Sequence, residues 1–352
     1  IVRPPLYPLV LVPCVAADPD GVRLIQWLQA LFGTLLVPVL AGIAGRWAGP
    51  KAGDRALVLA AFHPFLVYYG AFVVTEPLFL LLLWAALAAC LHVELDPARS
   101  TRWVVLAGIL FGLGCLCRPA LQPFLVPAAL WVGWRVRRAR GRRAALLAMA
   151  LLTAVVSALL VPWMVRNRLV HGEASLAPRN AQQVFSQGNS EAYLRVLEAG
   201  SQEEFYARHD EMSVPYLADG GVPPDQWAPI ATRFIRERPA DWMRLQWKKT
   251  LRFWTPWLDP VVHPATHVWL SLGATLPLFV FSAAALLRRR GRPDAFGKLL
   301  AALVLVGWLT GGFLFHVAVR YRIPFVDVTF LVLTASWLGR PGRPPRGTAR
   351  AA

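Results

Sequence analysis

The sequence predicts an all-α polytopic membrane protein with one large loop outside the bilayer. Of its 352 residues, 56% are hydrophobic and only 16% are charged, and the mean hydropathy is +0.46. Apolar runs of about 20 residues, enough to cross the hydrocarbon core as a helix, recur along the chain. The net charge of +17 is concentrated between these runs.

We expect a bundle of about nine membrane segments, each on one apolar run. Proline interrupts this pattern twice, because it removes a helix hydrogen bond. Pro64 follows His63 inside the second segment, where we expect His63 to bond a freed carbonyl, and Arg118-Pro119 separates the fourth from the fifth. The predicted segments are 24–44, 56–73, 76–95, 103–117, 119–134, 144–164, 265–287, 297–316 and 322–339.

The basic loops predict the orientation. Short loops rich in arginine and lysine stay in the cytoplasm, which places 135–143, 288–292 and the C-terminal tail inside and residue 1 outside. We therefore expect a multi-pass membrane protein with residues 166–262 outside the cytoplasm. Its predicted regions are an N-terminal membrane region 1–165, an extracytoplasmic loop 166–262, C-terminal membrane helices 263–340 and a basic cytoplasmic tail 341–352.

Composition also argues against some classes of protein and site. A strongly basic chain can bind nucleic acid, but here the arginines flank apolar runs, as topology signals do. The four cysteines lie in or beside apolar runs and support neither a disulfide framework nor a metal site. No glycine-rich nucleotide motif occurs. We therefore expect no nucleic acid, no metal ligands among the site residues and no cofactor. A divalent metal stays an open alternative that no residue pattern supports.

Arginines at the outer segment ends oppose the topology rule and need another reason. Snorkelling to the headgroups explains any single one, whereas several on one face indicate a shared anionic ligand. An arginine fork matches phosphate geometry. Arg320 and Arg322 flank Tyr321 just before a helix start at Ile323-Pro324, an arrangement suited to binding an anion. With Arg118, they are our candidates for binding a lipid phosphate.

The remaining candidates come from the same predicted face. Glu76 is the candidate catalytic carboxylate, able to hydrogen-bond a sugar or to orient an arginine. Alternatively, it is an N-terminal acid that complements the helix dipole, with Thr75 as the cap. The other residues expected in the pocket are Arg3, Tyr7, Tyr321, His316, Arg166 and Asn167. For Arg166 and Asn167 an anchoring role is the competing interpretation, and for His316 a hydrogen-bonded histidine at the membrane boundary.

The C-terminal part of the loop predicts a pair of amphipathic helices in the headgroup region. Ile230 and Phe234 lie one turn apart, and Trp242, Leu245, Lys249 and Phe253 follow at helical spacing. The tryptophans in this stretch alternate with arginine and lysine. They predict membrane anchoring and leave open a role in shaping the substrate site.

The succession RPPLYPLVL, VVTEPLFLLLL, GILFGLGCLCRPALQPF, VPWMVRNRLVHG and RYRIPFV resembles the GT-C superfamily of membrane glycosyltransferases. Within it the chain is most similar to protein-mannosyltransferase-like and RgtA-like enzymes, and more distantly to the aminoarabinose transferase of lipid A. The family carries an acidic catalytic motif in its first outer loop. Here that motif and the preceding helix would lie upstream of Ile1, where we expect the main catalytic acid.

The resemblance implies a glycosyltransferase that moves a sugar from a polyprenyl-phosphate donor to an acceptor hydroxyl. It also implies a bacterial inner (plasma) membrane, with the active face extracytoplasmic. The implied partners are that donor, the bilayer, and a glycan, lipid or protein acceptor. One alternative is a transporter or flippase of lipid-linked sugars, which favours midplane polar groups and internal repeats; we find no repeat. The other is an inactive scaffold left by truncation.

Overall fold

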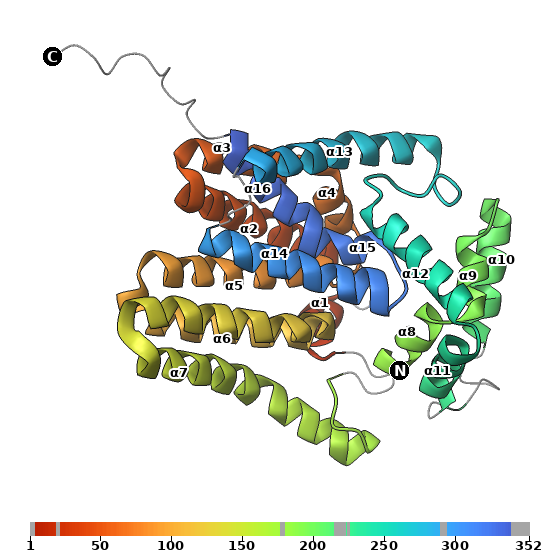
Figure 1. Ribbon diagram of the computed structural model, residues 1–352, viewed down its shortest axis with the longest axis horizontal. Coiled ribbons are helices and arrows are strands. Elements are labelled where there is room, and N and C mark those ends of the chain that lie inside the picture. Colours follow the sequence, from red (N-terminus) through yellow and green to blue (C-terminus); the bar gives the residue numbers. More distant parts are fainter. Residues whose placement is uncertain are drawn as a thin grey trace, which may run out of the picture.

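The computed structural model describes residues 4–18, 22–176, 180–214, 223, 226–288 and 294–338. Within these ranges the regular structure is entirely helical, which confirms the all-α class. Long helices lie side by side, and the shorter helices α8 to α12 gather at one end of them (Figure 1). Arg3, the loop 289–292 and the tail 341–352 fall outside the described residues.

The helices follow the chain in an order that repeatedly crosses the bundle. Short 3-10 turns, η1 and η2, and two π-helices, η5 and η6, interrupt the α-helical series. The bounds are α1 (Leu6–Ala17), α2 (Arg23–Ala48), α3 (Pro50–Ala61), α4 (Pro64–Ala71), α5 (Glu76–Leu95), η1 (Pro97–Arg99), α6 (Thr101–Cys117), η2 (Pro119–Leu121), α7 (Gln122–His171), α8 (Asn180–Gly188), α9 (Glu191–Leu197), α10 (Gln202–Ser213), α11 (Trp227–Glu237), α12 (Pro239–Trp254), α13 (Ala265–Arg288), α14 (Ala295–Trp308), η5 (Leu309–Leu314), α15 (Val319–Arg322), η6 (Ile323–Asp327) and α16 (Val328–Leu338).

Six stretches of the described chain are long and apolar enough to cross a membrane: Arg23–Ala48, Glu76–Leu95, Pro119–His171, Ala265–Leu287, Ala295–Leu314 and Val319–Leu338. Leu6–Ala17 and Thr101–Cys117 are shorter apolar helices. These helices confirm a polytopic membrane protein, while the number of nine segments stays a prediction.

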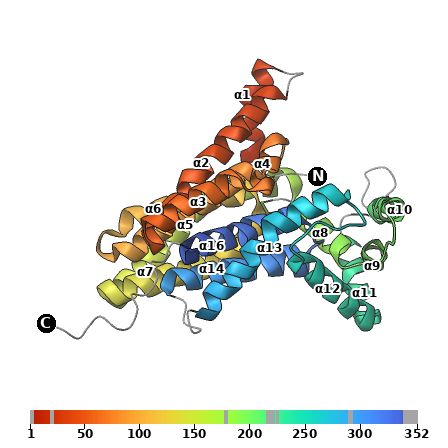
Figure 2. The ribbon, with the colours of Figure 1, turned by 90° about the horizontal axis from the view of Figure 1, so that it is seen from above.

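Several helix bounds differ from the sequence-based expectation. The second expected segment is two helices, α3 and α4, because the chain leaves the helix at Phe62 and His63 before Pro64. Neither ring nitrogen of His63 has a hydrogen-bond partner, so its expected bond to a carbonyl is absent. Helix α1 was not among the expected segments; its C-terminal end and the start of α2 project from the bundle (Figure 2).

The fifth and sixth expected segments form a hairpin inside α7. Gly141 turns the chain there, with φ of 82° and ψ of 179°, a backbone conformation that favours glycine. The two halves pack closely, because a Cβ atom at Gly133 would lie 2.3 Å from the sulfur of Met149. The hairpin tip carries the basic residues 135–143, so it marks the expected cytoplasmic end of the bundle.

Glycine also permits a close approach between α14 and η6. A Cβ atom at Gly307 would lie 2.3 Å from the Cβ atom of Phe325, whose position is fixed by its own backbone. Small residues at helix contacts allow the close packing that holds membrane helices together. This contact positions η6, and therefore the residues just before it.

We expect Gly307→Ala to destabilise the fold by about 1–3 kcal/mol, because the added methyl group overpacks this contact. The check is the thermal unfolding midpoint of the purified protein in detergent. Gly33→Ala in α2 is the matched control, because a Cβ atom there meets no other atom within 4 Å. Equal midpoints for both variants would contradict the tight contact.

Candidate functional site

The candidate site lies where the last two membrane stretches are irregular. α14 continues into the π-helix η5, residues 315–318 leave helical conformation, and α15 leads into the second π-helix, η6. π-Helical turns are rare and often occur at functional sites. The short segment between these two π-helices carries His316, Arg320, Tyr321 and Arg322.

A buried ion pair at the ends of α5 and α6 forms one side of the site. The Nη1 of Arg118 lies 3.0 Å from the Oε1 of Glu76, and both side chains are largely buried. Glu76 is the first residue of α5, and Arg118 caps the C-terminus of α6, where Pro119 stops the helix as expected. The pair therefore occupies a position that the two helix ends fix.

Tyr321 joins this ion pair to the last membrane segment. The guanidinium carbon of Arg118 lies 5.3 Å from the Tyr321 ring centre, and that of Arg320 lies 5.1 Å from it. The Tyr321 hydroxyl accepts a hydrogen bond from Arg320 at 3.1 Å and lies 3.1 Å from the Nε2 of His316. The structure thus brings five of the sequence candidates together: Glu76, Arg118, His316, Arg320 and Tyr321. We call these five residues the outer cluster.

His316 lies between the membrane-spanning stretches that end at Leu314 and begin at Val319. Its burial, followed by the positive charges of Arg320, His209 and Lys249, lowers its pKa to about 4. At neutral pH the imidazole is therefore uncharged, and its Nε2 can accept a hydrogen bond from the Tyr321 hydroxyl. The hydrogen bonds from Arg320 to Tyr321 and from Tyr321 to His316 form a chain that holds the Arg320 guanidinium in one orientation.

The structure places Arg322 differently from Arg320. Arg322 is 1% exposed, and its Nε lies 2.9 Å from the Oδ1 of Asp327. Its Nη1 donates to the carbonyls of Phe253 and Thr255 at the end of α12. These partners favour a structural role, so we leave Arg322 out of the phosphate site proposed below. Because residues five apart align in a π-helical turn, the pairing with Asp327 follows from η6.

The other expected pocket residues are spread over two places. Tyr7 donates to the Oε1 of Gln29 at 3.0 Å, and Gln29 also accepts from the backbone of Val74 at 3.1 Å, two residues before Glu76. Arg166 and Asn167 lie at the end of α7: Arg166 donates to the Asn167 side chain, and Asn167 donates to the Ser175 carbonyl at 2.7 Å. This geometry favours the anchoring interpretation for Arg166 and Asn167.

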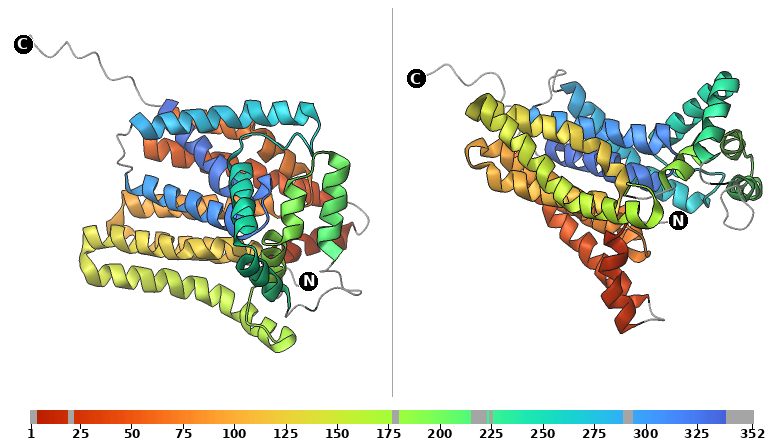
Figure 3. Two further views of the ribbon diagram at one scale, coloured as in Figure 1. Left: turned by 45° about the vertical axis from the view of Figure 1, so that its right-hand side comes forward. Right: turned by 90° about the horizontal axis from the view of Figure 1, so that it is seen from below.

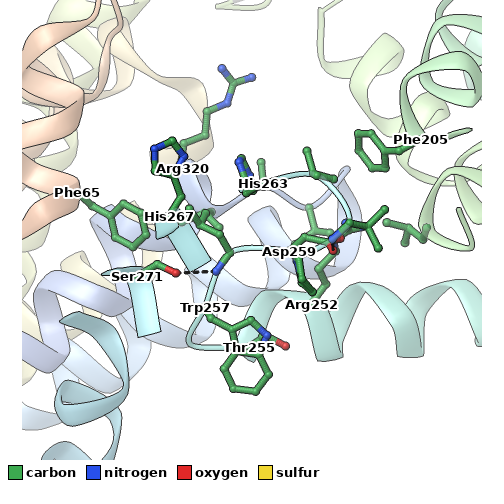
Figure 4. Close-up of a pocket in the computed structure, with 18 of the residues that line it drawn as sticks. Phe65, Phe205, Arg252, Thr255, Trp257, Asp259, His263, His267, Ser271 and Arg320 are labelled. Atoms are coloured by element: carbon green, nitrogen blue, oxygen red, sulfur yellow. Dashed lines mark hydrogen bonds and ion pairs between the residues drawn. The ribbon is translucent and has the colours of Figure 1, made fainter. Parts of the chain in front are cut away.

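A cavity of about 700 Å³ adjoins the outer cluster at Arg320. α4 and the start of α13 contribute one wall, with Phe65, Tyr68 and Leu270, and α9, α10 and α12 contribute the opposite wall. Arg320 and the imidazoles of His263 and His267 lie on the same side of the cavity (Figure 4). The cavity therefore combines an apolar wall from α4 and α13 with a polar end at Arg320.

The sequence did not identify several residues of this region. His263, His267 and the ion pair of Arg252 with Asp259 line the cavity, yet they lie in a proline-containing stretch without a motif. The available signal was the clustering of histidine, tryptophan and arginine just before α13. Among the described residues, no group of three or more His, Cys, Asp or Glu side chains is placed to hold a metal ion.

Comparison with known families gave a match to the N-terminal part of the chain. Residues 3–164 match the family model described as dolichyl-phosphate-mannose-protein mannosyltransferase. The resemblance to the GT-C superfamily is thereby confirmed over that region, which contains Glu76 and Arg118, and the match indicates a membrane glycosyltransferase of GT-C type. His316 to Arg322 and most of the cavity lie beyond it. No curated protein and no solved structure matched the chain.

We expect Arg118→Met to destabilise the protein by about 3–5 kcal/mol, because it leaves the buried Glu76 carboxylate without its cation. Adding Glu76→Gln should restore most of the lost stability, since no buried charge then remains unpaired. Unfolding midpoints of the wild type, both single variants and the double variant measure this coupling. Additive losses in the double variant would contradict a coupled pair.

We expect stability to fall as the pH drops from about 6.5 toward 4, in part because of His316. Its folded pKa of about 4 lies below the value of about 6.5 in an unfolded chain, so the unfolded state binds the proton first. The contribution of the uncharged His316 to stability is complete above a pH of about 6.5, and it is lost progressively as the pH falls from there toward about 4.

Unfolding midpoints at pH 4.5 and 7.5 test this expectation. His316→Asn should show a smaller difference between the two pH values than the wild type, while His171→Asn at the end of α7 serves as the control. If all three proteins lose the same amount on acidification, the assignment to His316 is wrong.

Proposed function

We propose that this protein transfers a sugar from a polyprenyl-phosphate-linked donor to an acceptor hydroxyl on the extracytoplasmic face. The observation that carries the proposal is the position of Arg320, which belongs to the outer cluster and also lines the cavity. A guanidinium placed there can bind the donor phosphate while the apolar wall receives the first part of the lipid. A lipid-borne anion is the ligand that matches both features.

Arg118 and Arg320 both approach Tyr321, one on α6 and the other on α15. We propose that the two guanidiniums bind the same phosphate. In the reaction the acceptor oxygen bonds to the anomeric carbon, and the bond from that carbon to the phosphate oxygen breaks. The leaving phosphate keeps the bonding electrons, and two fixed cations stabilise that developing charge.

Glu76 is the carboxylate of the outer cluster, and its ion pair suits the role of orienting Arg118. A charge-assisted bond of this kind holds a guanidinium in one direction and so limits the reorganisation needed when the phosphate binds. This supports one of the two functional roles considered for Glu76, orienting an arginine, over direct contact with the sugar. The acceptor hydroxyl would approach from the loop side, where α9, α10 and α12 line the cavity.

The proposed face follows from charge placement. The basic hairpin tip at residues 135–143 lies at the opposite end of the α7 hairpin from Gln122, close in sequence to Arg118. A cytoplasmic hairpin tip places the outer cluster outside. α12 runs across the direction of the long helices (Figure 3, teal, left), as a helix in the headgroup plane would. This supports the predicted pair of interfacial helices, α11 and α12.

We expect Arg320→Gln to lower sugar transfer by about 10²–10³-fold, because it removes a cation that stabilises the leaving phosphate. The assay uses the full chain in lipid nanodiscs, a radiolabelled sugar on polyprenyl phosphate and extracted envelope glycans, lipids and proteins as acceptors. Arg244→Gln on the exposed side of α12 is the matched control and should retain wild-type transfer.

Two results would overturn the proposal. One is full transfer and full donor binding by Arg320→Gln, which would remove the phosphate assignment. The other is wild-type protein in liposomes that moves the lipid-linked sugar between leaflets and transfers none of it, which would favour a flippase.

A further inference from the structure

The chain at the end of η5 and just after it is held by side chains rather than by helix hydrogen bonds. We call residues 313–317 the strap. The ammonium group of Lys249 on α12 donates to the Phe313 carbonyl, and the Nδ2 of Asn189 donates to the Leu314 carbonyl at 2.7 Å. An unpaired backbone group near a membrane is strongly unfavourable, so these side chains supply what the broken helix lacks.

Tyr193 holds the other end of the strap by two hydrogen bonds to one residue. Its hydroxyl accepts from the Val317 N–H at 2.8 Å and donates to the Val317 carbonyl at 3.3 Å. Burial raises the pKa of Tyr193, so the hydroxyl keeps its proton and can make both bonds. We call Asn189, Tyr193 and Lys249 the clasp.

The clasp is itself rigidly mounted. Its three side chains are almost completely buried, with Asn189 at 2%, Tyr193 at 4% and Lys249 at 0% exposure. The Oδ1 of Asn189 accepts from the indole of Trp242 at 3.1 Å and from the amide of Gln246 at 2.8 Å. Lys249 also donates to the Gly188 carbonyl at 3.0 Å, which ties α12 to the turn before α9.

The backbones of the turn and the strap touch directly. A Cβ atom at Gly188 would lie 2.5 Å from the backbone nitrogen of His316 and from the carbonyl carbon of Phe315. No side chain fits between them. The end of α8 and the strap are therefore packed backbone against backbone, and neither can move toward the other.

The strap leads directly to the residues of the outer cluster. His316 belongs to it, and Arg320 and Tyr321 follow within one turn. The ring of Tyr193 also meets that of His316 edge to face, with ring centres 6.4 Å apart. Displacing the strap would therefore displace His316, and with it the hydrogen bonds from His316 through Tyr321 to Arg320.

We infer that Asn189, Tyr193 and Lys249 are positioning residues, which hold the strap so that Arg320 and Tyr321 face the substrate. They act through the backbone of residues 313–317. Tyr193 also lines the cavity, so its test variant has to keep the ring and remove only the hydroxyl. The consequence for transfer rests on the proposed function, whereas the hold on the strap does not. The two can therefore be tested separately.

The test compares Tyr193→Phe with Tyr206→Phe in the full chain in nanodiscs. Both changes remove one hydroxyl and keep the ring, but Tyr206 is 49% exposed on α10. Hydrogen exchange of peptides covering residues 313–321, read by mass spectrometry, reports the hold on the strap without any need for activity. Steady-state transfer of the labelled sugar reports its consequence.

We expect Tyr193→Phe to speed exchange in these peptides about tenfold, because the Val317 N–H loses its acceptor. We expect kcat per folded molecule to fall about tenfold, with the donor KM changed far less, since the displaced cations act mainly in the transition state. Tyr206→Phe should match the wild type in both measurements. Gln246→Leu is the milder variant to use if Tyr193→Phe does not fold. It removes one of the two hydrogen bonds that the Oδ1 of Asn189 accepts.

Unchanged exchange in a folded clasp variant would overturn the inference, as would faster exchange with wild-type kcat. A purely structural role would lower the yield of folded protein and leave kcat per folded molecule intact, which also contradicts positioning. If the wild type itself transfers no sugar, the proposed function fails. The exchange measurement then still decides whether the clasp holds the strap.

Discussion

Breaks and ends of the helices leave backbone groups without a helix partner, and the structure depends on how these groups are paired. At 313–317 the partners come from the loop helices, at the end of α12 from Arg322, and at Val74 from Gln29. The broken ends are also where the charged and polar side chains gather. A constraint imposed by the membrane thus determines where chemistry is available.

Two arginines only two residues apart illustrate the difference between structure and function. Arg322 is surrounded by Asp327 and two carbonyls, whereas Arg320 bonds to a tyrosine hydroxyl and lines a cavity. A buried guanidinium with a full set of partners has little capacity to bind a further anion. The same residue type, two positions apart in the chain, therefore serves fold integrity in one case and ligand binding, as proposed, in the other.

The sequence predicted what depends on local rules. Proline placed the breaks at Pro64 and Pro119, and helical spacing placed Leu245, Lys249 and Phe253 on the buried side of α12. Topology placed Glu76, Arg118, His316, Arg320 and Tyr321 on one face, and the structure shows them in one cluster. The sequence could not distinguish the role of Arg322 from that of Arg320. A five-residue spacing pairs side chains only in a π-helix, and no sequence pattern predicted that π-helix.

Other features escaped the sequence because they join distant segments. Nothing local links Asn189 to Leu314 or Lys249 to Phe313, and the cavity needs six separate elements to form its walls. The helix α1 was missed for a different reason: at 12 residues it is shorter than a full membrane crossing. Only the folded backbone brings such pieces together.

The contact between Asn189 and Leu314 spans 125 positions of the chain, and this separation has a consequence for biogenesis. At a synthesis rate of about 5–20 residues per second, the turn around Gly188 waits roughly 6–25 s before its partner emerges. During that interval the hydrogen bonds that Asn189, Tyr193 and Lys249 later make to the strap have no protein partner, and water or lipid headgroups take its place. Insertion of the last two membrane helices is therefore the step that lets the loop helices α8 to α12 assume their final form, so late insertion and assembly of the candidate site are one event.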